Sequence, residues 1–185
     1  MNIEQQIADY KPYNEQEAHD QAVMRQLLAT QPDLFTRENQ VAHMTASSWL
    51  LNATHDKVLM IYHNIYHSWA WTGGHADGDG DFEAVARREA QEETGIQNLK
   101  KLGAGAASLE VLPVWAHQKR GQMVASHLHL NISYLFEADD TLPLRIAEDE
   151  NSAVGWLGID RLDEYVSERD MLPTYRKILN RTNVC

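Results

Sequence analysis

The stretch that most constrains how this 185-residue chain can fold is segment 73–96, an acidic, glycine-rich loop followed by a helix-like sequence. Asp81 is a favourable first residue, because its side chain can accept a hydrogen bond from a free backbone N–H of the first turn. Gly95 is typical of the position just past a helix end. The alanine, glutamate, arginine and glutamine residues between them favour helix. The segment therefore predicts a helix that begins near Asp81 and ends at Gly95, with Arg87 on its outward face.

Three carboxylates share one face of this predicted helix. At about 100° per residue, Glu89, Glu92 and Glu93 continue the apolar stripe that begins at Phe82 and Val85. Carboxylates that are partly buried and close together take up protons or pair with cations. Because all the offered ligand atoms are oxygens, Mg²⁺ or Mn²⁺ is favoured over zinc. For three glutamates alone, a solvated acidic helix face is the commoner outcome, so the preceding loop must decide between the two interpretations.

The loop and helix together closely resemble the Nudix box, G-x5-E-x7-R-E-U-x-E-E-x-G-U, in which U is an apolar residue. Gly74 begins the pattern and residues 88–96 (REAQEETGI) complete it, so the match spans 23 residues with fixed spacing. The departure is Gly80, which stands where the family has glutamate. Asp79 and Asp81 flank it and are the candidates to replace that glutamate. The segments GHADGD, HLH and ENSAVGWL also resemble a bacterial Nudix subgroup with a GHADGD-type box.

This resemblance implies an α/β fold, a Nudix-type α/β/α sandwich around a mixed β-sheet. It also implies an enzyme that hydrolyses a pyrophosphate bond in a nucleoside diphosphate linked to another moiety, with Mg²⁺ as cofactor and Mn²⁺ as the alternative ion. By motif match, the metal ligands are Glu89, Glu92, Glu93 and the carbonyl of Gly74. Glu92 is also a candidate to accept the proton of the attacking water. Arg88 belongs to the catalytic set as the residue that holds the acidic cluster in place.

A further acidic residue is expected from a later loop. In many relatives, an acidic residue before the penultimate strand joins the metal site or acts as the base. Here Glu148, Asp149 and Glu150 lie just before the apolar segment 153–157. Glu150 is the first choice among them, and an ordinary solvated acidic turn is the alternative.

Three residues are candidates for substrate binding. His75 follows the first glycine of the box, Trp69 is an aromatic ring that can stack on a nucleobase, and Arg120 is a cation that can meet a phosphate. The usual fate of tryptophan is core packing, and the usual fate of a loop arginine is a solvated turn. These two outcomes stay open as alternatives.

Nine histidines raise the question of a zinc site. His127 and His129 are two residues apart in a strand-like segment, so their side chains are expected on one face. No cysteine lies nearby and no third histidine is evident in the sequence to complete a site. Zinc is therefore not expected, and contact with a phosphate or plain surface or core placement is favoured for this pair.

The rest of the chain predicts alternating strands and helices. Residues 1–12 are polar and expected to be loosely attached, residues 115–122 read as a polar loop, and residues 142–146 as an edge segment. We expect an N-terminal helical extension, 1–40, packed on a Nudix hydrolase domain, 41–185. The predicted helices are 14–30, 162–166 and 173–180, and the predicted strands are 41–52, 57–62, 68–72, a segment within 102–114, 124–137 and 153–157.

Composition limits the partners. A net charge of −11 disfavours broad contact with a nucleic-acid backbone, whereas a small nucleotide-type substrate remains compatible with it. The single cysteine, Cys185, suits a reducing compartment, and no signal peptide or membrane span is recognisable, so a cytoplasmic location is expected. A homodimer is neither predicted nor excluded. Two other functions stay open, a catalytically weakened Nudix-fold nucleotide-binding or regulatory module, and an isoprenoid diphosphate isomerase, which ranks last.

Overall fold

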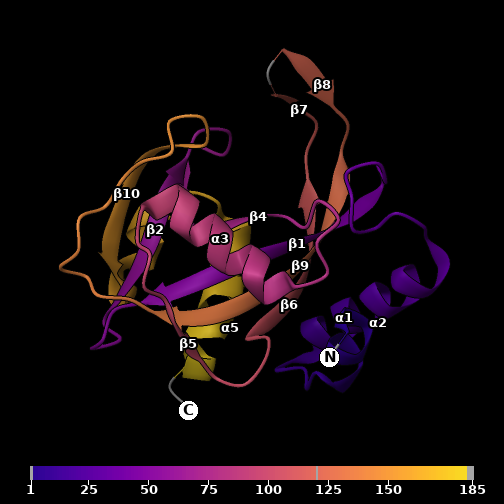
Figure 1. Ribbon diagram of the computed structural model, residues 1–185, viewed down its shortest axis with the longest axis horizontal. Helices are drawn as coiled ribbons and strands as arrows, with labels where there is room; N and C mark the ends of the chain where they lie inside the picture. Colours follow the sequence, from indigo (N-terminus) through magenta and orange to yellow (C-terminus); the bar gives the residue numbers. More distant parts are fainter. Residues whose placement is uncertain (1, 120, 183–185) are drawn as a thin grey trace.

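The computed structural model describes residues 2–119 and 121–182 and has a mixed β-sheet between helical layers (Figure 1). The helices are α1 (Ile3–Asp9), α2 (Glu15–Thr30), α3 (Phe82–Thr94), α4 (Leu162–Tyr165) and α5 (Leu172–Thr182). The strands are β1 (Ala42–Leu51), β2 (Lys57–His63), β3 (Ser68–Ala70), β4 (Thr72–His75), β5 (Lys100–Leu102), β6 (Ser108–Val114), β7 (His117–Lys119), β8 (Gln122–Val124), β9 (His127–Glu137) and β10 (Asn151–Gly158).

The sheet runs in the order β10-β2-β1-β9-β5, with β3 beside β2, β4 beside β1 and β6 beside β9. The long strands β1 and β9 are parallel, and the other pairs are antiparallel. This confirms the predicted mixed sheet. The hairpin of β7 and β8 forms a separate two-stranded sheet that projects from the body of the molecule.

The two faces of β1 have different roles because alternate side chains of a strand point to opposite sides. Met44, Ala46 and Leu50 belong to the core beneath α3, whereas Trp49 and Leu51 belong to the core beneath α5. Helix α3 and helix α5 therefore cover opposite faces of the sheet (Figure 1). This arrangement confirms the predicted α/β/α sandwich.

Helix α3 forms where the sequence predicts it. The side chain of Asp81 accepts a hydrogen bond from the backbone N–H of Ala84, and Gly95 ends the helix in the left-handed conformation with φ of 82°. Phe82 and Val85 are fully buried. The prediction for Arg87 is wrong: its guanidinium is half-buried, donates to the carbonyl of Leu99 and lies over the ring of Phe136. Its aliphatic stem covers apolar surface that a shorter residue would leave exposed.

The N-terminal helices are an integral part of the core. Ile3 and Ile7 of α1 and Met24 of α2 are buried in the same apolar cluster as α3. The expectation that residues 1–12 are loosely attached is therefore wrong, because two isoleucines spaced four residues apart place one face of α1 against the core. Asn2 caps this short helix through the N–H of Gln5.

Three other expectations about strands need correction. Segment 68–72 is not one strand: it contains β3, which pairs with β2, and the start of β4, which pairs with β1. Segment 115–122 contains part of the β7–β8 hairpin instead of a loop. Segment 142–146 forms no strand, which agrees with the missing N–H of Pro143. Strand β5 was not predicted, because Lys100 and Lys101 make it polar and only three residues long.

Candidate active site

The glycine strand β4 lies directly against the acidic face of α3. The backbone N–H of Gly73 donates to the carboxylate of Glu93 at 3.0 Å. A Cβ atom on Gly74 would lie 2.3 Å from Oε2 of Glu89, so any side chain at position 74 would displace this carboxylate. The box glycines therefore allow two carboxylates to approach a bare stretch of backbone.

These two carboxyl groups are kept from water. Glu93 is 2% exposed, and burial, followed by the nearby charge of Glu150, raises its pKa well above the ordinary value. Burial, followed by the charge of Glu92, raises the pKa of Glu89 to about 7. Such groups hold protons in the absence of a cation and release them when a cation binds. An all-oxygen set of this kind fits a hard divalent ion such as Mg²⁺.

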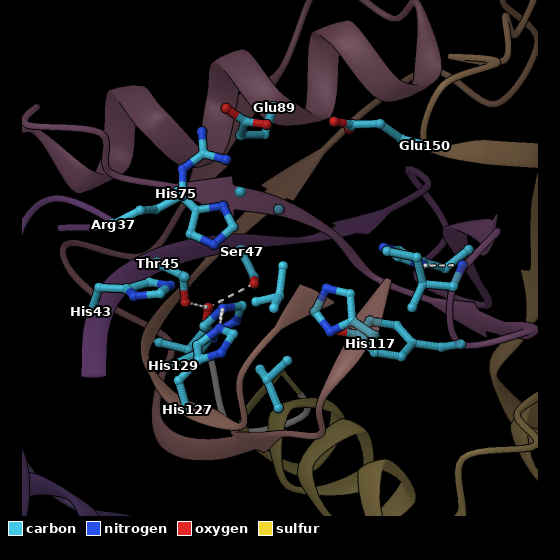
Figure 2. A pocket seen from close by; sticks show the side chains of 18 of the residues that line it. Arg37, His43, Thr45, Ser47, His75, Glu89, His117, His127, His129 and Glu150 are labelled. Carbon is cyan, nitrogen blue, oxygen red and sulfur yellow. Dashed lines mark hydrogen bonds between the residues drawn. The ribbon is translucent and has the colours of Figure 1, made fainter. Parts of the chain in front are cut away.

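The third carboxylate of the helix differs from the other two. Glu92 is exposed to solvent, although the sequence places it in line with the core residues. It lines the same pocket as Glu89 and Glu93, and so does Glu150 from the loop before β10 (Figure 2). The site thus combines a buried and a half-buried carboxylate with several that are open to solvent, Glu92 and Glu150 among them.

Arg88 links the acidic helix to the loop that precedes it. Its guanidinium lies 3.4 Å from Oδ2 of Asp79 and 3.9 Å from Oε1 of Glu89. Asp79 also accepts a hydrogen bond from the N–H of Asp81, which itself caps α3. Asp79 therefore contacts the arginine from the position before Gly80, where the family pattern has its glutamate.

The pocket is a cavity of about 770 Å³ with chemically different ends (Figure 2). The carboxylates of α3 and of the loop before β10 line one end, and a group of histidines lines the other. Arg37 lies between them, where it donates to both carboxylate oxygens of Asp77, at 2.8 and 2.5 Å. Arg37 comes from the segment between α2 and β1, and no motif in the sequence singled it out.

The floor of the pocket is the polar face of β1 and β9. The hydroxyl groups of Thr45 and Ser47 donate to the side-chain oxygen of Asn131 at 3.1 and 2.8 Å. The amide nitrogen of Asn131 donates to Glu110 at 3.0 Å. These polar residues alternate with the buried apolar residues of the same strands. This alternation is the feature of the sequence from which a polar pocket floor could have been predicted.

Four histidines converge at the far end of the pocket, and we call them the histidine cluster: His43, His75, His127 and His129. His127 and His129 share one face of β9, as predicted, and their Nε2 atoms are 3.1 Å apart. The expectation that no third histidine completes the group is wrong. His43 on β1 is paired in register with His129, and His75 on β4 is paired with Thr45 of β1, so strand pairing joins residues that are far apart in sequence.

The other predicted substrate-binding residues have different positions. Trp69 does not line the pocket; it packs edge-on against Tyr62 and over Gly155 within the region covered by α5. Trp71, two residues later, lines the pocket instead. Arg120 lies outside the described residues. His75 lines the pocket as the member of the histidine cluster that lies nearest to the carboxylates.

The mixed sheet, with a glycine strand packed on a carboxylate-bearing helix, is the architecture of a Nudix-type hydrolase. A profile of the NUDIX domain family matches residues 41–181, and the chain therefore belongs to this family. The chain matches no curated protein. Within residues 2–119 and 121–182, no helix combines the length and apolar character needed to cross a membrane.

Solved structures agree with this fold. An Ap4A hydrolase from C. elegans, in a binary complex, is 16% identical, covers 77% of this chain and 98% of its own, and has a TM-score of 0.57. A NUDIX family hydrolase from Clostridium perfringens is 19% identical, with coverages of 75% and 96% and a TM-score of 0.52. The Nudix hydrolase RenU from M. smegmatis is 16% identical, with coverages of 77% and 86% and a TM-score of 0.57. At these identities the likeness concerns the fold.

Proposed function

We propose that this enzyme hydrolyses a pyrophosphate bond in a nucleoside diphosphate linked to another moiety, and that it uses Mg²⁺, with Mn²⁺ as the alternative ion. The observation that carries this proposal is the pair Glu89 and Glu93, which are withdrawn from water, raised in pKa and packed against the bare backbone of Gly73 and Gly74. Carboxylates in such a setting gain most from a divalent cation. A bound Mg²⁺ would neutralise pyrophosphate charge and lower the pKa of a water molecule.

Each residue of the site has a proposed part. Glu89 and Glu93, with the carbonyl of Gly74 and with Glu92, would hold the ion. Glu92 and Glu150 are two pocket carboxylates that face solvent, so either is placed to take a proton from the attacking water. Glu92 is the first choice, because it lies on the rigid helix and Glu150 lies on a loop. Arg88 positions Glu89 and the preceding loop and does not itself reach the pocket lining.

The decisive experiment is a panel of substrates assayed with and without Mg²⁺. Nucleotide sugars, dinucleoside polyphosphates, ADP-ribose and nucleoside triphosphates cover the main chemical classes, and released phosphate or nucleotide is measured. We expect Mg²⁺-dependent turnover of at least one compound. Tight nucleotide binding without turnover of any compound would contradict the proposal and favour the catalytically weakened binding module.

A paired variant tests the part of Glu92. We expect Glu92→Gln to lower kcat by about 100-fold or more, within the range for a lost general base, with little change in melting temperature. Glu148→Gln is the matched control, because Glu148 is an exposed carboxylate of the loop before β10 and does not line the pocket. Equal kcat in wild type and Glu92→Gln would remove Glu92 from the mechanism and leave Glu150 as the base.

Several finer assignments belong to the same proposal. The box sequence GHADGD, at residues 74–79, supports a place in the bacterial subgroup, and the strongly negative charge supports a small substrate over a polymeric nucleic acid. We retain a cytoplasmic location and the division into an N-terminal extension, 1–40, and a hydrolase domain, 41–185. His75 and, from outside the described residues, Arg120 remain proposed substrate contacts.

A further inference from the structure

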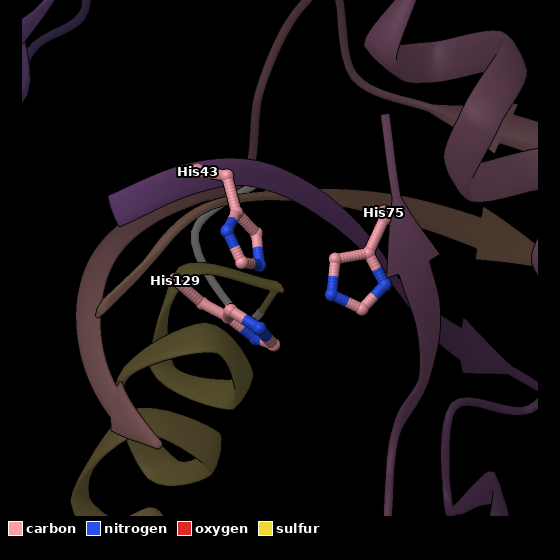
Figure 3. Close-up of side chains that lie close together, drawn as sticks. All are labelled: His43, His75 and His129. Carbon is pink, nitrogen blue, oxygen red and sulfur yellow. The ribbon is translucent and has the colours of Figure 1, made fainter. Parts of the chain in front are cut away.

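We propose that His43, His75 and His129 form a second metal site, specific for a divalent transition-metal ion of the Zn²⁺ type, at the end of the pocket opposite the carboxylates. One ring nitrogen from each of these three residues lies within 4.8 Å of the others (Figure 3). This inference stands on the histidine cluster alone and does not depend on the reaction proposed above.

His43 provides the strongest indication that an ion binds here. The residue is 5% exposed, and its Nδ1 donates a hydrogen bond to the backbone carbonyl of Asn39 at 3.0 Å. Because a carbonyl can only accept, the proton of the neutral ring lies on Nδ1 and Nε2 carries a bare lone pair. That Nε2 atom is buried and has no hydrogen-bond partner among the described residues. A ring N–H held by a backbone carbonyl, with the other nitrogen free, is the usual arrangement of a metal-binding histidine.

The geometry needs only a small adjustment to bind an ion. In a tetrahedral zinc site with Zn–N bonds of about 2.0–2.1 Å, neighbouring nitrogens are about 3.3 Å apart. The three donor atoms here are within 4.8 Å, and His75 and His129 are only half-buried, so rotation of these two side chains can close the gap. The backbone positions are held by strand pairing of β1 with β9 and with β4, which fixes the three Cα atoms in advance.

His127 offers a fourth donor. Its Nδ1 donates to the carbonyl of Ala125 at 2.8 Å, which leaves its Nε2 as an acceptor, 3.1 Å from Nε2 of His129. In the absence of an ion, His129 therefore donates to His127. Nε2 of His127 would be available as a further imidazole donor to an ion bound here.

The ligand types separate the two metal sites chemically. Imidazole nitrogens suit Zn²⁺, Ni²⁺, Cu²⁺ and Fe²⁺, whereas carboxylate and carbonyl oxygens suit Mg²⁺ and Mn²⁺. The histidine cluster presents ring nitrogens, and the carboxylates of α3 present oxygens. An excess of Mg²⁺ should therefore fill the carboxylates of α3 and leave the histidine cluster to the transition metal.

The test is Zn²⁺ binding to chelator-treated protein in the presence of excess Mg²⁺. We expect one Zn²⁺ per chain that survives desalting. We also expect the affinity to be about 100-fold or more weaker in His43→Gln and in His129→Gln, because loss of a ligand exceeds the effect of losing a residue that only orients a ligand. His19→Gln is the matched control, since His19 is an exposed histidine on α2. Glu89→Gln should bind Zn²⁺ as the wild type does. Zn²⁺ binding that is unchanged in both histidine variants, or lost in Glu89→Gln, would overturn the proposal.

A second measurement keeps the test decisive if a histidine variant fails to fold. X-ray absorption of the Zn²⁺-loaded wild type should show a first shell dominated by nitrogen at about 2.0–2.1 Å, with the outer-shell scattering of imidazole rings. An oxygen-only shell, or no retained Zn²⁺, would contradict the site. In that case the histidine cluster would be left as a hydrogen-bonding surface for a substrate phosphate.

Discussion

At the scale of single residues, the site depends on the absence of a side chain. Gly74 lies so close to Glu89 that a Cβ atom would overlap the carboxyl group, whereas a Cβ atom on Gly80 would meet nothing within 4 Å. Gly74 on β4 and Gly80 in the loop that follows therefore have different reasons to be present. Gly74 permits the approach of a ligand carboxylate, and Gly80 only occupies a position in an open turn.

We expect Gly74→Ala to lower kcat by about 100-fold, because displacement of a ligand by about 1 Å can cost this much. Gly80→Ala is the matched control and should retain wild-type kcat. Steady-state kinetics under saturating Mg²⁺ measures both, and circular dichroism checks that each variant is folded. Equal loss in the two variants would mean that the loop is sensitive as a whole and that contact with Glu89 is not the cause.

The raised pKa of Glu89 predicts how pH affects the metal-free protein. The folded state holds this proton up to pH about 7, whereas the unfolded chain releases it near the ordinary value of 4.5. The contribution of this bound proton to the stability of the folded state is therefore present below pH 4.5 and is lost as pH rises through 7. Because Mg²⁺ must displace this proton, the increase in melting temperature caused by Mg²⁺ should be larger at pH 8 than at pH 6. Glu89→Gln should remove most of that difference, and an equal Mg²⁺ effect at both pH values would contradict the assignment.

At the scale of elements, the segment between α2 and β1 contributes to the pocket from outside the matched family domain. Leu34 is buried at 3% exposure, and its carbonyl accepts the N–H of Met44 at 2.7 Å. This anchoring places Arg37 at the pocket wall, where Asp77 holds its guanidinium. The N-terminal extension therefore supplies a cation next to an acidic site, and a cation there suits an anionic substrate.

We expect Arg37→Ala to raise KM about 10-fold with little change in kcat, since an exposed arginine contact to phosphate should act mainly on binding. Glu38→Ala, at the next exposed position, is the matched control and should leave KM unchanged. The measurement is the KM for whichever compound the substrate panel identifies. An unchanged KM in Arg37→Ala would restrict Arg37 to its ion pair with Asp77.

At the level of the whole molecule, a buried polar network joins helix α2, the sheet and the last helix, α5. Glu17 of α2 is fully buried and lies 3.1 Å from Nζ of Lys177 and 3.0 Å from Arg181, both on α5. Lys177 also lies 3.0 Å from Glu110 of β6, which reaches Asn131 on the floor of the pocket. The pocket floor is therefore continuous with a network that holds α2 and α5 to the sheet.

Loss of the Glu17 charge should destabilise the fold strongly. Burial alone would raise the pKa of Glu17, but the backbone N–H of Tyr13 and the charge of Lys177 bring it below the ordinary value. The stabilisation is thus present above pH 4.5 and is lost as pH falls through the folded-state pKa. At pH 7, Glu17→Gln should lower the free energy of unfolding by about 3 kcal/mol, as for a buried ion pair that loses one partner.

The exposed Glu15 on the same helix provides the control for this prediction, and Glu15→Gln should change the free energy of unfolding by less than about 0.5 kcal/mol. Urea denaturation at pH 7 and at pH 4 measures both variants. The difference between wild type and Glu17→Gln should shrink at the lower pH. A constant difference at both pH values would show that packing, and not charge, holds Glu17.

The sequence predicted what is encoded locally. Helix α3, with its cap at Asp81 and its end at Gly95, follows from a continuous run of residues, and so do the strand core 108–114 and the shared face of His127 and His129. Contacts that depend on strand pairing were not predictable, because nothing in the sequence around His43 indicates that this residue lies opposite His129 of β9. Arg37 was missed because the segment that carries it is held in place by the burial of Leu34 and by a backbone hydrogen bond to Met44, and no local pattern in the sequence indicates these contacts. Glu92 was misjudged because helical periodicity gives direction, whereas exposure depends on what packs opposite.

If the carboxyl pair Glu89 and Glu93 on α3 holds a divalent ion, Mn²⁺ binding followed by electron paramagnetic resonance will detect it. The protein is first loaded with Zn²⁺, so that the histidine cluster does not contribute. Wild type and His43→Gln should each bind Mn²⁺ with similar affinity, whereas Glu93→Gln, whose amide oxygen can still accept the N–H of Gly73, should bind it about 100-fold more weakly while remaining folded. Equal Mn²⁺ affinity in wild type and Glu93→Gln, or no binding in either, would contradict the account.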